Sequence, residues 1–247
     1  MTTRYRIRWT KLGRTRFISA RDLTSVWERA LRRADLPIAY SEGFTPHAKV
    51  SFPDALPVGA ESTGEYAELT FTAPIDAEHD LARLSAHLPE GMDITTYWHV
   101  PSGAPKLARM LGATLWELSW PPVDAAELTE LLRRRSSALL DREHVEVIRH
   151  RHDGDRTIDV RPAVLQLAAS ARHTDTGGVC TVLRAVLRND GPTVRPTDLH
   201  AALSHDDIAG PARSRRVAQG EPVPDGLREA LSGTLEPMVV DVDAEAA

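Results

Sequence analysis

Two hydrophobic periodicities alternate along the first hundred residues, and their order constrains the fold more than any other feature of the sequence. Tyr5, Ile7 and Trp9 alternate with arginines, as in a half-buried strand, whereas the apolar residues between Ser19 and Pro37 recur at helical spacing. The expected elements are a strand at 5–9, a helix at 19–36, strands at 48–52 and 66–71, a helix at 76–88 and a strand at 94–100. This order, β-α-β-β-α-β, is that of the ferredoxin-like split unit.

The second half repeats this pattern less regularly. A strand with alternating tryptophans and leucine at 116–120 precedes a helix that begins near Asp124, and Asp153-Gly154 marks a hairpin. A β-branched run at 179–187 follows, and then a short helix. The sequence therefore predicts an α+β protein with two ferredoxin-like (βαββαβ-type) units in tandem, the second less regular. The predicted boundaries are 1–103 for the first unit, 110–220 for the second α+β unit and 221–247 for a C-terminal tail.

Composition excludes several classes of protein. The chain has no apolar stretch near the 18 residues of a membrane span and no signal-peptide core at its start, so we expect a cytoplasmic protein without a membrane partner. Its one cysteine, Cys180, cannot form an internal disulfide, and its apolar surroundings favour a buried structural thiol. His150 and His152 have the spacing of a ligand pair on a strand, but no third ligand accompanies them, so no metal site is predicted.

Charge is unevenly distributed along the sequence. The formal net charge is -5, yet residues 1–50 hold 11 Lys and Arg against 4 Asp and Glu, a net of +7. Residues 51–100 hold 1 against 9, a net of -8. A basic segment inside an acidic protein indicates an anionic partner, which the average charge conceals.

The basic segment supplies the candidate binding residues. Arginine side chains are suited to phosphate because their guanidinium groups offer forked donors, and an aromatic ring beside them can stack on an unpaired base. An ordinary solvated helix face and a buried Phe44 are the alternative interpretations. The candidate nucleic-acid-binding residues are Arg14, Arg16, Arg21, Arg29, Arg32, Arg33, Phe44, His47 and Lys49.

The same segment resembles the radical-SAM-linked family, a domain of unknown function. The resemblance rests on Phe17-Ile-Ser-Ala-Arg-Asp-Leu23, Glu28-Arg-Ala-Leu-Arg-Arg-Ala34, Leu36-Pro37, Tyr40-Ser-Glu-Gly-Phe-Thr-Pro46, Lys49-Val-Ser-Phe52, Ala55-Leu-Pro-Val-Gly59 and Glu65-Tyr66. Ile158-Asp-Val-Arg-Pro162 is similar to the family's second-half signature. The sequence departs from the family at Ala20, where a histidine is common.

The resemblance implies a partner that carries out radical chemistry. Members of the family are encoded beside, or fused to, radical S-adenosylmethionine enzymes, whose iron–sulfur cluster needs three closely spaced cysteines. With Cys180 alone, this chain is expected to hold no cofactor, so S-adenosylmethionine and the cluster are expected in the partner. The absence of a histidine at position 20 weighs against an enzymatic role, and no catalytic residue is identified.

We therefore expect an accessory protein that binds RNA, either tRNA or rRNA, and presents it to a radical SAM protein for modification. Two alternatives stay open. One is an enzyme acting on RNA or on a small anionic substrate, with His47 as the acid or base. The other is a protein–protein adaptor that binds no RNA.

Overall fold

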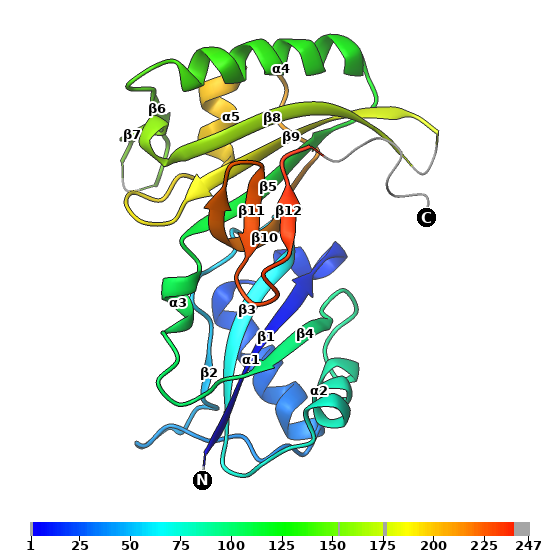
Figure 1. Ribbon diagram of the computed structural model, residues 1–247, viewed down its shortest axis with the longest axis vertical. Helices are drawn as coiled ribbons and strands as arrows, with labels where there is room; N and C mark the ends of the chain where they lie inside the picture. Colours follow the sequence, from blue (N-terminus) through cyan, green and yellow to red (C-terminus); the bar gives the residue numbers. More distant parts are fainter. Residues whose placement is uncertain (1, 153, 175–176, 240–247) are drawn as a thin grey trace. The chain divides into compact units, whose positions relative to one another are not determined.

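The computed structural model describes residues 2–152, 154–174 and 177–239 (Figure 1). The chain divides into two compact units, Met1–Met110 and Leu111–Ala247. Each unit combines helices with an antiparallel array of strands, so the mixed α+β class is confirmed. Among the described residues, no helix is long and apolar enough to span a membrane.

The first unit contains each of the six elements that the periodicity predicts. Its strands have the order β4-β1-β3-β2, and all of its neighbouring strands are antiparallel. The second strand of the predicted series, β2, is only two residues long. The elements are β1 (Thr3–Lys11), the 3-10 helix η1 (Gly13–Phe17), α1 (Ala20–Arg33), β2 (Val50–Ser51), β3 (Glu61–Phe71), α2 (Ala77–Ala86), β4 (Ile94–His99) and α3 (Leu107–Met110).

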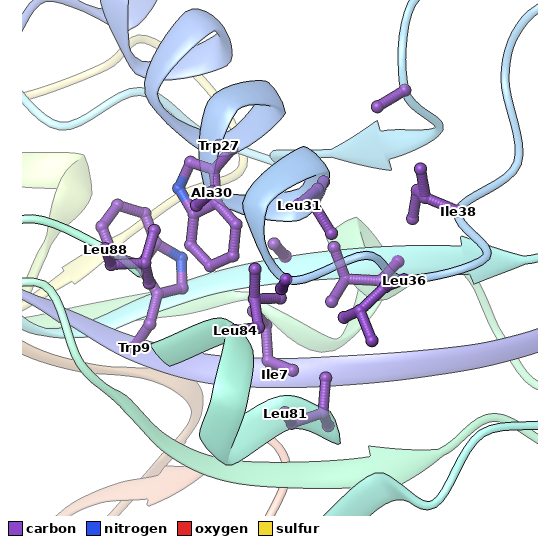
Figure 2. Close-up of a cluster of buried hydrophobic side chains, with 14 of the residues drawn as sticks. Ile7, Trp9, Trp27, Ala30, Leu31, Leu36, Ile38, Leu81, Leu84 and Leu88 are labelled. Atoms are coloured by element: carbon purple, nitrogen blue, oxygen red, sulfur yellow. The ribbon is translucent and has the colours of Figure 1, made fainter. Parts of the chain in front are cut away.

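The core of the first unit lies between β1 and the two helices α1 and α2. Figure 2 shows the side chains of these helices pointing toward Ile7 and Trp9 of β1. Trp27 of α1 is fully buried and meets Trp9 edge-on, with ring centroids 5.3 Å apart. Because one face of α1 is fixed in this way, its opposite face must be at the surface.

The second unit has four main strands in the order β10-β5-β9-β8, again antiparallel. The helices α4 and α5 lie against one face of these strands (Figure 1), while β6 and β7 form a separate hairpin. The elements are β5 (Ala113–Trp120), α4 (Ala125–Leu140), β6 (Glu146–Arg149), β7 (Arg156–Asp159), the 3-10 helix η2 (Arg161–Ala163), β8 (Val164–His173), β9 (Val179–Arg188), α5 (Pro196–Ser204), β10 (Arg213–Val223), β11 (Gly226–Glu229) and β12 (Leu235–Pro237).

Two features of the second unit differ from the sequence-based prediction. The strand β8 was not predicted, because its alanines and serine have little intrinsic preference for strands and are stabilised by pairing with β9, which is distant from any local pattern. The tail predicted from residue 221 is wrong over 226–237, where β11 and β12 pair with each other and Leu227 is fully buried. Residues 240–247 of that tail, and Asp153 of the predicted turn, lie outside the described residues.

Candidate nucleic-acid interface

The helix α1 carries the centre of the candidate surface, and its orientation follows from its sequence. Ser19 caps the helix: its Oγ accepts a hydrogen bond from the backbone N–H of Asp22 at 3.2 Å and donates one to the Asp22 carboxylate at 2.7 Å. Leu23, Trp27 and Leu31 are buried on one face. The predicted helix start and apolar face are both confirmed, and the arginines therefore project from the other side.

The arginines of β1 do not contribute to this surface, although they belong to the same basic segment. Glu68 of β3 accepts hydrogen bonds from Arg4 and Arg6, each at 3.0 Å. Arg6 is buried and also donates to the backbone oxygen of Pro105. Part of the acidic stretch at 51–100 therefore neutralises part of the basic stretch at 1–50, which the sequence order alone does not reveal.

The arginines of α1 are different because no carboxylate pairs with them. Among the described residues, no ion pair or side-chain hydrogen bond involves Arg21, Arg29, Arg32 or Arg33, and all four are exposed. The same holds for Lys49 in the segment that follows the helix. Five positive charges with solvated head groups are therefore available on this helix and its neighbouring segment.

The loop at 41–47 lies beside α1 and presents an aromatic side chain. Tyr40 and Ala48 form an antiparallel bridge, and Ser41 closes the loop: its N–H donates to the His47 oxygen at 2.8 Å and its Oγ accepts from the His47 N–H at 3.0 Å. Phe44 lies within this closed loop and is fully exposed. The alternative interpretation of Phe44 as a core residue is therefore wrong.

His47 attaches the loop to the helix. Its Nδ1 is 3.1 Å from Oε1 of Glu28, which lies on the outer face of α1 between Arg21 and Arg32 along the helix. The imidazole side chain is 61% exposed. This pair fixes where the loop sits relative to the arginines, and it leaves His47 able to contact an anionic ligand.

The 3-10 helix before α1 adds two further candidates and one residue that sequence analysis missed. Arg14 is exposed, whereas Arg16 is half-buried and lies 3.7 Å from Glu61. The guanidinium of Arg16 also covers the ring of Phe17, 4.5 Å from its centroid. Phe17 is 59% exposed, and its position directly after Arg14-Thr-Arg16 is the signal that could have identified it.

The second-half signature, 158–162, has a structural role. Arg161 donates from Nη2 to the backbone oxygen of Leu140 at 2.9 Å, which satisfies a carbonyl at the C-terminal end of α4. Asp159 accepts from the backbone N–H of Val145 at 2.9 Å and from that of Arg161 at 3.1 Å. This segment therefore holds α4 and the neighbouring hairpin together.

The remaining sequence signals do not form a site. His150 Nδ1 is 2.9 Å from Asp155 at the surface, and the described residues include no group of three His, Cys, Asp or Glu side chains that could hold a metal ion. Ala20 is exposed in the first turn of α1. Cys180 is half-buried, which corrects its prediction as a buried structural thiol.

Comparison with known proteins identifies the family. A family model described as an uncharacterized protein conserved in bacteria (DUF2344) matches residues 4–196. No curated protein matches the chain at a significant level. Among solved structures, the chain is similar to an unknown protein from Galdieria sulphuraria, at 11% sequence identity and a TM-score of 0.25, over 76% of this chain and 82% of that chain. Because the family model covers well over half of the sequence, the chain belongs to the DUF2344 family of uncharacterized bacterial proteins.

Proposed function

We propose that the outer face of α1 and the loop at 41–47 bind RNA. The observation that carries this proposal is the set of unpaired, exposed cations on α1 beside a fully exposed Phe44. Phosphate contacts need cations that no carboxylate already neutralises. The α1 arginines meet this condition, whereas Arg4 and Arg6 of β1 are paired with Glu68. An exposed phenylalanine gains no stability from burial but offers a stacking surface to an unpaired base.

The arrangement favours single-stranded or looped RNA over a regular duplex. Stacking on Phe44 requires a base that is not already stacked within a helix, and the arginine-covered face of α1 follows a backbone without reading base edges. This surface lies on the helix side of the first unit and not on its strands. The sheet-based stacking of other small RNA-binding folds therefore does not apply, and the proposal rests on this local chemistry alone.

The strand orders support a ferredoxin-like assignment for both units. In the first unit β1 lies between β4 and β3, and β2 pairs with the outer edge of β3. In the second unit β5 lies between β10 and β9, and β8 pairs with the outer edge of β9. Two interleaved β-α-β crossovers produce this order. In the second unit the series is β5-α4-β8-β9-α5-β10, with the β6–β7 hairpin inserted after α4.

A radical SAM enzyme is the proposed partner that receives the RNA. This part of the proposal rests on the motifs at 17–66, which resemble the radical-SAM-linked family. It also rests on the cysteine count: these 247 residues hold one cysteine, whereas a radical SAM cluster needs three. The RNA-binding surface and the radical chemistry would then belong to different polypeptides.

One pull-down from cells tests both parts. The tagged chain is recovered with and without nuclease treatment, and the bound proteins and RNA are identified. Recovery of RNA together with an iron–sulfur radical enzyme supports the proposal. Recovery of a protein partner with no RNA, unchanged by nuclease, would leave an adaptor function in its place.

Phe44→Ala is expected to weaken binding to single-stranded RNA by about 1–3 kcal/mol, the contribution of one stacked base. Binding to a duplex of the same length should change little, because its bases are not available for stacking. Fluorescence anisotropy with labelled oligonucleotides measures both affinities. Val123→Ala, which truncates another exposed apolar side chain, is the matched control. Equal loss of affinity for single strand and duplex would refute a stacking role for Phe44.

A further inference from the structure

Glu28 lies on the outer face of α1, among the arginines of the proposed RNA surface. Arg21 is seven residues before it and Arg32 is four residues after it, and these spacings place the three side chains on one stripe of the helix. At a rise of about 1.5 Å per residue, Arg21 is about 10 Å and Arg32 about 6 Å from Glu28 along the helix axis. The stripe therefore presents a carboxylate between two guanidinium groups.

The carboxylate of Glu28 contacts the loop at 41–47 and not the arginines. On a helix surface, a glutamate four residues before a basic residue commonly forms an ion pair with it. Glu28 and Arg32 have this spacing, but no ion pair joins them among the described residues. Instead, Oε1 of Glu28 lies 3.1 Å from Nδ1 of His47. This contact brings the carboxylate beside the loop that presents Phe44.

One oxygen of this carboxylate is available to a ligand. An ionised carboxylate only accepts hydrogen bonds, so Nδ1 of His47 is the donor to Oε1. Within the part of the chain that the structure describes, Oε2 of Glu28 has no donor, and it is not a buried atom. The contact with His47 holds the side chain, which is 25% exposed. Oε2 is therefore a positioned acceptor that an external donor can reach.

A base edge suits this position better than a phosphate does. The carboxylate repels phosphate, so the backbone of a bound strand is expected at the arginines on either side of Glu28. Cytosine carries an N4 amino group from which a glutamate can accept a hydrogen bond. Uracil carries a carbonyl oxygen at the same place, as thymine does, and a carboxylate cannot accept from it.

We propose that Glu28 selects a base with an exocyclic amino group, in preference to uracil, for the nucleotide that stacks on Phe44. This inference rests on the proposed RNA-binding function and adds a sequence preference to it. Contacts of the α1 arginines with phosphate carry no sequence information, and stacking on Phe44 tolerates every base. Phe44 is three residues before His47 in the closed loop, so the stacked base lies near the carboxylate that His47 holds.

Oligocytidine and oligouridine of equal length are the probes, with fluorescence anisotropy on the full chain. The original protein should bind oligocytidine about tenfold more tightly, for one hydrogen bond to a charged acceptor. In an oligomer of pyrimidin-2-one riboside, a hydrogen replaces the N4 amino group of cytidine. Its affinity should fall to that of oligouridine. An affinity equal to that of oligocytidine would overturn the proposal, because the amino group would then make no contact.

Glu28→Gln removes the charge and retains a side-chain carbonyl that can accept from His47. The preference for oligocytidine should fall from about tenfold to about threefold, because a hydrogen bond to an uncharged acceptor is about half as strong. Glu42→Gln is the matched control: it removes an exposed carboxylate from the same loop and should keep the tenfold preference. An undiminished preference in Glu28→Gln, or an equal loss of affinity for both oligomers, would overturn the proposal.

The RNA surface and the role of Glu28 fail in different ways. If the original protein binds neither oligomer at low salt, the RNA surface is wrong and the role of Glu28 falls with it. If the protein binds both oligomers equally and salt weakens the binding, the RNA surface stands. That result overturns the role of Glu28 alone.

Discussion

Glu117→Gln is expected to destabilise the second unit by about 3–5 kcal/mol, as expected when one partner of a buried ion pair is removed. Glu117 is buried, and Arg172 and Arg184 are its ion-pair partners. The substitution preserves shape and removes only charge, so the two guanidinium groups lose their counter-ion without creating a cavity. Urea unfolding followed by circular dichroism measures the change in free energy of unfolding.

A matched control separates this effect from a general cost of removing a carboxylate. Glu130 of α4 lies 3.7 Å from Arg133, and both side chains are more than half exposed. Glu130→Gln should change the free energy of unfolding by less than about 0.5 kcal/mol, because exposed pairs contribute little. Similar effects of the two substitutions would show that the buried cluster does not stabilise the unit.

The same cluster sets an expected dependence of stability on pH. Burial opposes ionisation of Glu117, but hydrogen bonds and charges from Arg172 and Arg184 outweigh it and hold the pKa of this carboxyl below its ordinary value. A lowered pKa in the folded state contributes stability that is present above the ordinary glutamate pKa near 4.5 and is lost as the pH falls through the lowered value. Glu117→Gln should therefore reduce the loss of stability on acidification.

Trp27→Ala is expected to cost the first unit about 3–5 kcal/mol, the range for truncating a buried aromatic side chain to alanine. The indole ring is fully buried and packs edge-on against Trp9 at 5.3 Å and beside Phe52 at 5.9 Å. Its removal is expected to leave a cavity between α1 and β1, where the ring lies among other buried side chains (Figure 2). Urea unfolding again provides the measurement.

Phe44→Ala is the control for the loss of an aromatic side chain. Phe44 is fully exposed, so its truncation should leave the free energy of unfolding within about 0.5 kcal/mol of the original. A Trp27→Ala protein as stable as Phe44→Ala would contradict the packing described for this core.

Local patterns were sufficient to predict the elements of the first unit and the orientation of its basic helix α1. The apolar spacing of Leu23, Trp27 and Leu31 predicts which face of α1 is buried, and Ser19 predicts where the helix begins. These signals are local because helical periodicity and capping act within a few residues. The exposure of the α1 arginines follows from the same periodicity.

Long-range pairing accounts for what the sequence did not predict. Glu68 neutralises Arg4 and Arg6 across neighbouring strands, and no local pattern predicts that partner. The strand β8 forms through its register with β9, which brings Arg172 to Glu117. The ion-pair cluster of Glu117, Arg172 and Arg184 depends on such pairings, so the sequence contains its residues but gives no sign that they meet.

The salt dependence of RNA binding tests the central claim most directly. The original protein, Arg29→Ala/Arg32→Ala and the control Arg134→Ala/Arg142→Ala are titrated with single-stranded RNA at several salt concentrations. Both variants remove two exposed charges, but only the first removes them from α1. The proposal predicts binding that weakens with salt, with a log–log slope reduced by about 1.4 in the α1 variant, for two lost phosphate contacts, and unchanged in the control. Absent binding at low salt, or equal slopes in all three proteins, would contradict it.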